Sequence, residues 1–325
     1  MSTSAEILTA LEESPVRLWV PATSANLGPG YDSFGLAHSL YDHLTLSVHP
    51  ESDDLRHRVH ITGEGAEVLP RDHRHLVLRI VSEVVAAHGF SVGDELALTA
   101  HNAIPQSRGL GSSAAATVAG IGLAFGLLDR IEATAGVKNR VLTPGRALEA
   151  LRWAVHYEGH PDNAAPALYG GVTISTMRGG VPHTYPLQVH PDIRTVVVIP
   201  EESLHTEKAR EMLPATVGHA EAAANSAAAG VLALALMSNP EVLCAGTVDY
   251  LHQNYRRPAM PRTLDRIDAL REKGLAAVVS GAGPTVLVLG TGDDLEARVK
   301  NVLSGDSARI VQTSIAATGL VYADK

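Results

Sequence analysis

The spacing of apolar residues along the first half of the chain changes between the alternation typical of strands and the three-to-four spacing typical of helices. The run LVLRIVSEVVAAH, residues 76–88, has helical spacing, and Gly89 directly after it is a common helix stop. The segment ELALTAHNAIP, residues 95–105, alternates as a strand does and ends at a proline. Two further strands are predicted over residues 16–20 and 43–49, and two further helices over 112–128 and 146–157.

The second half, after Gly170-Gly171, has helices in its middle and strands on either side of them. Its pattern predicts strands over residues 171–176, 193–200, 276–280, 285–290 and 308–315, and helices near 206–213, 217–237, 241–252, 262–273 and 293–303. The first half lacks the strict strand–helix–strand alternation of a parallel sheet. We therefore expect an α+β protein.

The length and the change of pattern predict two domains. A domain commonly has about 100–200 residues, and the chain has 325. The pattern changes near residues 170–190, so we expect an N-terminal domain over residues 1–175 and a C-terminal domain over residues 176–325.

Composition narrows the class of protein. Hydrophobic residues make up 45% of the chain and the net charge is −9, which favours a large core and excludes a generally basic, nucleic-acid-binding surface. The longest weakly polar runs, residues 112–128 and 222–237, fall short of the roughly 20 strongly apolar residues of a membrane span, and the N-terminus does not have the pattern of a signal peptide. Cys244, the single cysteine, lies in an apolar context and is expected to be buried. We expect a cytoplasmic protein with no nucleic acid and no membrane as partner.

The run PQSRGLGSSAAATVAG, residues 105–120, joins a glycine-rich turn to the start of a predicted helix. Backbone N–H groups at such a helix start, capped by a serine, bind anions. Three interpretations stay open on these residues alone: a phosphate-binding loop, a helix whose alanines only permit close packing, and a dinucleotide fingerprint. The last has some support because GLGSSA fits G-x-G-x-x-A and Asp129 follows at a suitable distance, but Pro105 and Arg108 lengthen the turn.

Other turn-rich segments carry polar residues. PATSANLGPGYDSFG, residues 21–35, contains Asn26 and Asp32, and its glycines allow a ligand to approach the backbone. SGAGP, residues 280–284, joins two predicted strands in the same manner. Either segment could equally be an ordinary turn.

The segment YEGHPDNAAPALYGG, residues 157–171, follows a predicted helix. Glu158 is a candidate Mg²⁺ ligand there. A zinc site from His156 and His160 is disfavoured, because Gly159 and Pro161 break the helix that such a site needs. Further along the chain, Arg210 and Arg256 are candidate partners of a carboxylate, for which arginine offers two-pronged geometry.

Taken in order, these motifs resemble those of the GHMP kinases, a family of small-molecule kinases. The matching segments are PATSANLGPGYDSFGLA, P-x-x-x-GLGSSAA and SGAGPT, and GHPDNAAPALYGG, TEKAREMLP and LHQNYR are similar to segments of the homoserine kinases within it. The resemblance covers about residues 16–290. It implies an N-terminal domain like ribosomal protein S5 domain 2, a ferredoxin-like C-terminal domain, a homodimer, and transfer of phosphate from ATP to the hydroxyl of L-homoserine, a step toward threonine.

The resemblance also implies roles for particular residues. Asp32 would bind the substrate ammonium, the two arginines its carboxylate, and Asn163 would orient its hydroxyl, with a role of Asp162 as a base less favoured. His75 stands where the family usually has asparagine before the helix of its adenine pocket. The implied sites are ATP on Pro105, Arg108, Gly109, Leu110, Gly111, Ser112, Ser113 and Ala114; Mg²⁺ on Ser113 and Glu158; homoserine on Asn26, Asp32, His160, Arg210 and Arg256; and catalysis by Asn163 and Arg210.

Three alternatives remain at this stage. One is a GHMP-type kinase of a sugar or isoprenoid alcohol, the second a Rossmann-type dehydrogenase, and the third a non-catalytic binding protein on the same fold.

Overall fold

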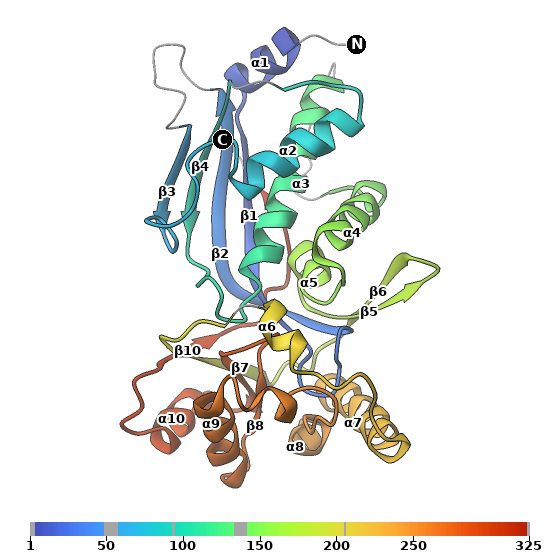
Figure 1. Ribbon diagram of the computed structural model, residues 1–325, viewed down its shortest axis with the longest axis vertical. Helices are drawn as coiled ribbons and strands as arrows, with labels where there is room; N and C mark the ends of the chain where they lie inside the picture. Colours follow the sequence, from blue (N-terminus) through green and yellow to red (C-terminus); the bar gives the residue numbers. More distant parts are fainter. Residues whose placement is uncertain (1–3, 49–57, 93–94, 133–141, 205, 324–325) are drawn as a thin grey trace.

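The computed structural model describes residues 4–48, 58–92, 95–132, 142–204 and 206–323, and these form two layered halves, one above the other in Figure 1. The upper half contains a seven-stranded sheet whose main path runs β11-β1-β2-β4-β3, with β5 added to β2 and β6 to β5. Its strands are β1 (Val16–Ala25), β2 (Phe34–Val48), β3 (Val59–Gly63), β4 (Leu96–Asn102), β5 (Val172–Arg178), β6 (Val181–Leu187) and β11 (Val321–Tyr322).

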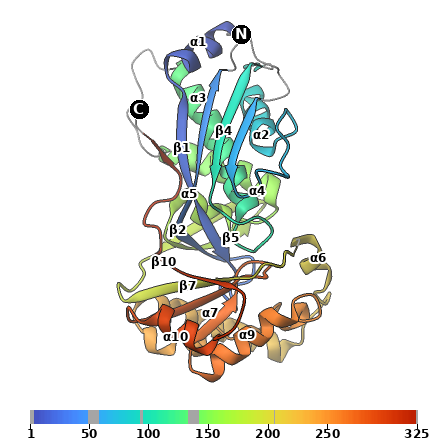
Figure 2. The same cartoon turned by 90° about the vertical axis from the view of Figure 1, so that its left-hand side faces the viewer.

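Helices cover one face of this sheet, so that Figure 2 shows the strands in front and the helices behind them. They are α1 (Ser4–Glu13), α2 (Leu76–Ala87), α3 (Ser112–Glu132), α4 (Pro144–Glu158) and α5 (Ala164–Tyr169). The central one is α3, whose Ala115, Ala119 and Phe125 are fully buried in the core with Leu18 and Val20 of β1. The small side chains on α3 let it approach both the sheet and α2, which is the packing role that its alanines suggested.

The lower half is a four-stranded antiparallel sheet in the order β10-β7-β9-β8. Its elements are β7 (Ile193–Ile199), α6 (Thr206–Glu211), α7 (His219–Met237), a 3₁₀ turn (Pro240–Val242), α8 (Leu243–Gly246), a second 3₁₀ turn (Asn254–Arg256), α9 (Pro261–Glu272), β8 (Ala276–Val279), β9 (Val286–Thr291), α10 (Leu295–Val302) and β10 (Arg309–Thr313). Counting α9 and α10, and leaving aside α6, α7 and α8 between β7 and α9, the elements follow the β-α-β-β-α-β order of ferredoxin-like folds. The expected α+β class is confirmed.

The sequence-based prediction missed short elements and misplaced one helix. Strands β3, β6 and β11 and helices α1 and α5 were not predicted. The predicted helix over 241–252 is wrong: only short turns form up to Gly246, because the carboxylate of Asp249 accepts the backbone N–H groups of Leu251, His252 and Gln253 and folds this segment into a tight turn instead.

The expectation for Cys244 is also wrong. Its side chain is exposed, and its thiol lies 3.2 Å from the carbonyl oxygen of Gly274. The one-turn helix α8 is too short to bury every side chain that it carries.

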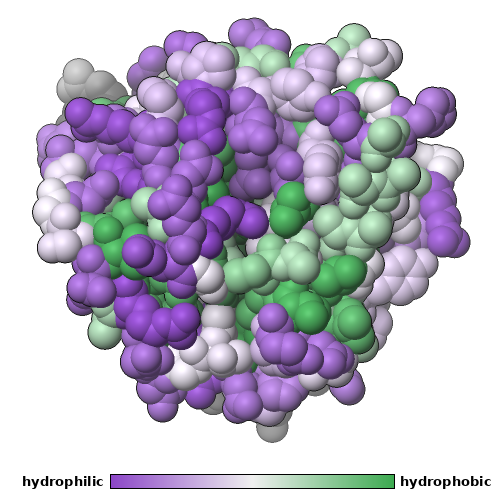
Figure 3. Space-filling view, turned by 90° about the horizontal axis from the view of Figure 1, so that it is seen from below, coloured by the Kyte–Doolittle hydropathy of each residue, from purple (hydrophilic) through white to green (hydrophobic). Residues whose placement is uncertain are grey.

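Among the described residues, α3 and α7 are the two helices long and apolar enough to cross a membrane by length and composition alone. In α3 most of the apolar window is buried inside the protein, whereas in α7 only 28% is. The face of α7 left open carries Leu234 and Met237, each about half exposed. In the view from below, apolar side chains gather toward the right, the side on which α7 lies in Figure 1 (Figure 3).

Candidate active site

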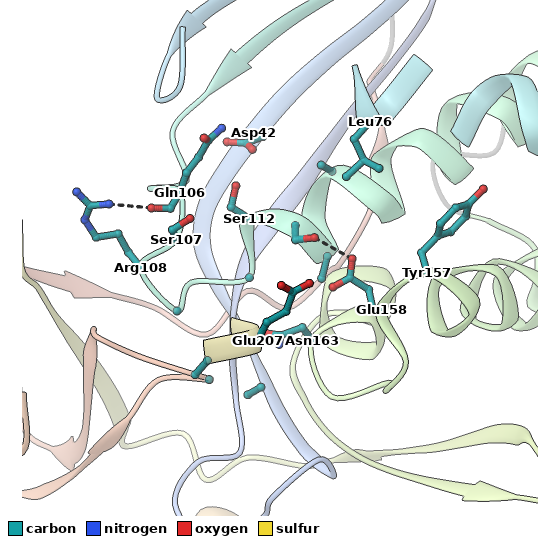
Figure 4. Close-up of a pocket in the computed structure, with 18 of the residues that line it drawn as sticks. Asp42, Leu76, Gln106, Ser107, Arg108, Ser112, Tyr157, Glu158, Asn163 and Glu207 are labelled. Carbon is teal, nitrogen blue, oxygen red and sulfur yellow. Dashed lines mark hydrogen bonds between the residues drawn. The ribbon is translucent and has the colours of Figure 1, made fainter. Parts of the chain in front are cut away.

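A cavity of about 630 Å³ lies where the two halves meet, and residues from both line it. Figure 4 shows Ser112, Glu158, Asn163 and Glu207 turned toward this common space from α3, α4, the turn before α5, and α6. The cleft therefore collects residues from all the motifs singled out in the sequence. Of the predicted site residues only Pro105 and Leu110 do not line it; both are buried behind the loop.

The glycine-rich loop before α3 is held by hydrogen bonds from both halves. The carbonyl oxygen of Leu110 accepts from the N–H of Thr23 at 3.0 Å, and that of Gly109 accepts from the hydroxyl of Ser280 at 2.5 Å. A methyl group placed on Gly111 would lie 2.0 Å from Oγ1 of Thr23, and both loop glycines have positive φ angles, 75° for Gly109 and 69° for Gly111. Only glycine fits these positions. The loop thus delivers free backbone N–H groups at the positive end of α3, an arrangement that binds phosphate.

Arg108 lines the cleft but directs its guanidinium elsewhere. It donates to the carbonyl oxygens of Gln106, Pro200 and Glu201 at 2.8, 3.0 and 2.6 Å. The arginine therefore ties the loop of the upper half to the end of β7 in the lower half.

An acidic and hydroxyl-bearing cluster stands at the start of α3. The hydroxyl of Ser113 donates to Oε1 of Glu158 at 3.0 Å, and the hydroxyl of Thr117, one turn further along α3, donates to the same oxygen at 2.9 Å. Carboxylate and hydroxyl oxygens are the ligands that Mg²⁺ prefers. The donor set of Ser113 and Glu158 therefore fits Mg²⁺, and Thr117 is a further member that the sequence motif did not indicate.

A charged pair faces this cluster from the lower half. Arg210 of α6 donates to both carboxylate oxygens of Asp32, at 2.7 and 3.2 Å, and to the hydroxyl of Tyr31 at 3.0 Å. Asn26 and Asp32 both have positive φ angles, 69° and 53°, and Oδ1 of Asn26 accepts the N–H of Asp32. Such left-handed backbone in non-glycine residues is concentrated at functional sites.

A second polar group lies between α4 and α5. Nδ1 of His160 and Oδ1 of Asp162 are 2.5 Å apart, and the same oxygen accepts the N–H of Asn163 at 2.8 Å. Burial alone would lower the pKa of His160, but the hydrogen bond and the charge of Asp162 outweigh it and raise that pKa. The side-chain oxygen of Asn163 accepts from Thr23 at 2.8 Å. Ligand atoms of Asp32, His160 and Asp162 lie within 4.8 Å of one another, so this group is a second place in the described chain where a cation could bind.

Arg256 is 2% exposed, yet it lines the cleft. Its Nε donates to the carbonyl oxygen of Ala209, next to Arg210, at 3.1 Å, and its Nη1 to that of Gly281 at 3.2 Å. Its Nη2 has no hydrogen-bond partner among the described residues. This nitrogen is available to a ligand.

The far end of the cleft is mainly apolar, and of its residues the sequence analysis singled out only His75. It is lined by Leu44, Leu69, Leu76 and Ala100, with Asp42 and His75 as polar members. His75 is 5% exposed, its Nδ1 has no hydrogen-bond partner in the part of the chain that the structure describes, and burial lowers its pKa to about 4, so the ring is neutral at pH 7. Asp42 accepts the N–H groups of Ala103 and Ile104, and burial raises its pKa to about 6.

Comparison with known proteins agrees with this geometry. The family models for the GHMP kinases N terminal domain and the GHMP kinases C terminal match residues 75–171 and 231–306. A homoserine kinase of Cutibacterium acnes is 43% identical over 87% of this chain and 92% of its own, and one of Streptomyces avermitilis is 42% identical over 95% and 96%. The solved structure of a homoserine kinase from Cytophaga hutchinsonii superposes with a TM-score of 0.77 at 22% identity, covering 95% of this chain and 97% of that one. A putative homoserine kinase from Listeria monocytogenes gives 0.70 at 29% identity, covering 95% and 99%.

Proposed function

The chain belongs to the homoserine kinases of the GHMP kinase family, and from that premise we propose how its cleft transfers the γ-phosphate of ATP to the hydroxyl of L-homoserine. One observation carries the proposal: an anion-binding helix start and a carboxylate–arginine pair face the same cavity. The first suits the phosphates of ATP and the second suits an amino acid. A sugar or an isoprenoid alcohol has no ammonium group for Asp32, and the antiparallel pairing of β2 with β1 and β4 does not fit a Rossmann-type dehydrogenase.

The ATP phosphates are assigned to the loop from Arg108 to Ala114. The backbone N–H groups around Gly109–Ser113 and the dipole of α3 neutralise their charge. Ser113 and Glu158 would hold Mg²⁺, which supplies further neutralisation of the β- and γ-phosphates when bound. We propose that the upper half provides these groups and that the lower half adds Arg210 and Arg256 on the substrate side. The expected boundary between residues 175 and 176 does not separate the two halves, because β6 (Val181–Leu187) and β11 (Val321–Tyr322) belong to the upper sheet.

The homoserine site is assigned to Asn26, Asp32, His160, Arg210 and Arg256. The Asp32–Arg210 pair has the two charges that a zwitterionic amino acid also has. Homoserine can therefore enter by exchange: its carboxylate replaces Asp32 as the partner of Arg210, and its ammonium replaces Arg210 as the partner of Asp32. The charge balance of the cleft is the same before and after binding.

Phosphoryl transfer needs alignment and charge stabilisation more than covalent help. Asn163 is proposed to orient the attacking hydroxyl, while Arg210 fixes the rest of the substrate. Oδ1 of Asp162 already binds His160 and the N–H of Asn163, which supports a structural role for this carboxylate. If Asp162 is no base, Asp162→Asn lowers kcat by less than about a hundredfold, since general bases contribute about 10²–10⁴; a larger loss at unchanged KM would contradict this.

Location and oligomeric state are also part of the proposal. The net charge of −9 supports an enzyme without nucleic-acid partners, and we propose that it acts in the cytoplasm without a membrane partner. A homodimer is supported by the exposed apolar side chains of Leu234 and Met237 on α7. Sedimentation measures the oligomeric state: we expect the wild type to be a dimer and a Leu234→Glu/Met237→Glu variant to be a monomer.

The direct test of the function is ADP release with and without L-homoserine, with the product identified by phosphorus NMR. We expect release that depends on homoserine and formation of a phosphate monoester. Mevalonate, galactose and glycerol serve as alternative acceptors. A higher kcat/KM with any of these would overturn the assignment of the substrate.

A further inference from the structure

His252 is fully buried beside the arginine that the proposed function assigns to the substrate carboxylate. It comes from the tight turn that replaces the predicted helix over 241–252. Its Nε2 lies 2.8 Å from the carbonyl oxygen of Gly28, and its Nδ1 lies 3.1 Å from Nη1 of Arg256. The imidazole is thus inserted between a turn of the upper half and an arginine of the lower half.

The partners of His252 fix its protonation state. A carbonyl oxygen can only accept, so Nε2 carries the proton and donates to Gly28. A guanidinium can only donate, so Nδ1 must present a lone pair to Arg256. Burial lowers the pKa of His252, which keeps the ring neutral and this lone pair available. Asp249, whose Oδ1 is 3.5 Å from Nε2, accepts the backbone N–H groups of the same turn.

Arg256 depends on such neighbours for its orientation. Its Nε and Nη1 are held by the carbonyl oxygens of Ala209 and Gly281 and by His252, and its Nη2 is left for a ligand. Of these contacts only the one to His252 comes from a side chain. The other ring nitrogen of His252 binds Gly28 in the segment of residues 21–35, so this contact links Arg256 to the upper half. The ring centroid of Tyr31, whose hydroxyl accepts from Arg210, lies 5.4 Å from that of His252, so His252 contacts Arg256 directly and packs beside the ring that Arg210 contacts.

We propose that His252 is a positioning residue for homoserine: in the tautomer that the carbonyl oxygen of Gly28 selects, it accepts from Arg256 and so fixes the guanidinium where Nη2 can meet the substrate carboxylate. The inference rests on the proposed function, and it assigns no contact between His252 and substrate. His252 therefore governs the KM for homoserine and leaves the ATP side unaffected.

Two substitutions separate the two hydrogen bonds. In His252→Asn the side-chain oxygen can take the place of Nδ1 and still accept from Arg256, while the bond to Gly28 is lost. In His252→Gln the longer amide can reach the place of Nε2 and still donate to Gly28, while the acceptor for Arg256 is lost. Both variants replace the ring by an uncharged amide. Asn is one methylene shorter than Gln and loses more packing at this buried position, so a packing effect alone would make His252→Asn the more damaged variant.

The experiment measures KM for homoserine, KM for ATP, kcat and the thermal midpoint of both variants beside the wild type. We expect His252→Gln to raise the homoserine KM about tenfold or more, in line with losing a hydrogen bond to a charged group, and His252→Asn to stay within about threefold. The ATP KM stays unchanged in both. Equal changes of the homoserine KM in both variants, or none in either, would overturn the inference. A wild type without homoserine-dependent ADP release would refute the proposed function instead.

Discussion

The two sides of the cleft are built in different ways. The ATP side comes largely from one stretch, residues 105–114, together with Glu158 of α4, and it offers mainly backbone N–H groups. The homoserine side is assembled from segments far apart in the chain, around residues 26–32, 160–163, 210 and 256, and it offers charged side chains. One side is formed by local backbone geometry and the other by tertiary packing.

This difference predicts different weaknesses. A backbone site tolerates changes of neighbouring side chains but not an added Cβ atom at a glycine with positive φ. A side-chain site loses its ligand when a single charge is removed, because the partner charge is left unpaired in a partly buried place. Variants on each side should therefore affect the two substrates separately.

The largest effect is expected at Glu158, the carboxylate beside the start of α3. Glu158→Gln removes the charge that accepts from Ser113 and Thr117 and would hold Mg²⁺, and we expect kcat to fall about 10²–10³-fold, as for loss of one preorganised electrostatic group. Steady-state kinetics at varied Mg²⁺ measures it. Glu149→Gln, on the same helix but paired with Arg146 outside the cleft, is the control and should stay near wild type. Equal losses in both variants would refute the metal assignment.

Removing a charge on the homoserine side comes next. Arg210→Ala deletes the partner of Asp32 and of the substrate carboxylate, so the homoserine KM should rise about a hundredfold while the ATP KM changes less than about threefold. Arg257→Ala is the matched control, because Arg257 pairs with the exposed Asp265 and Asp268 on α9. Similar increases in both Michaelis constants would show that the two sides of the cleft are not independent.

The same difference explains what could be predicted from the sequence. The loop and α3 were predictable, because a glycine-rich turn and a helical pattern lie within one short run; the expected serine cap is not seen, since α3 begins at Ser112 itself and the hydroxyl of Ser113 donates to Glu158. Asn26, Asp32, His160, Arg210 and Arg256 were assigned only through the resemblance of an ordered set of motifs, since each alone could be an ordinary turn or a solvated charge. The structure brings all five to the cleft.

Other contributors had no local signal. Asp42 directly precedes the strand predicted over 43–49 and carries no pattern of its own, yet it accepts the N–H groups of Ala103 and Ile104 some 60 residues later. His252 lies in a run that has helical spacing and folds as a turn, because the carboxylate of Asp249 competes for its backbone N–H groups. Such roles depend on which segments meet in space, which hydrophobic periodicity does not encode.

A smaller effect is expected from the glycines of the ATP side. Gly111→Ala puts a methyl group against Thr23 in a backbone with positive φ, and strain of this kind costs about 1–3 kcal/mol. We expect the ATP KM to rise about tenfold and the homoserine KM to change much less. Gly179→Ala has positive φ as well, but nothing lies within 4 Å of the added methyl group, so it controls for backbone strain alone. An increase confined to the homoserine KM would reverse the assignment of the two sides.

The smallest effect is on the pH dependence of stability at the homoserine side. Asp162 raises the pKa of His160 above 6.5 in the folded protein. A group with a raised folded-state pKa stabilises the fold fully below its unfolded-state pKa, and this contribution is lost as the pH rises through the folded-state value. The thermal midpoint of the wild type should therefore exceed that of His160→Gln most below pH 6.5, with the difference shrinking toward alkaline pH. His183→Gln, at an exposed position on β6, should show no such trend. The same comparison is then made with Asp162→Asn in both proteins. The difference in thermal midpoint that His160→Gln causes should no longer depend on pH, because the carboxylate that stabilises the protonated ring is gone. If the pH dependence persists, the charge of Asp162 is not its cause.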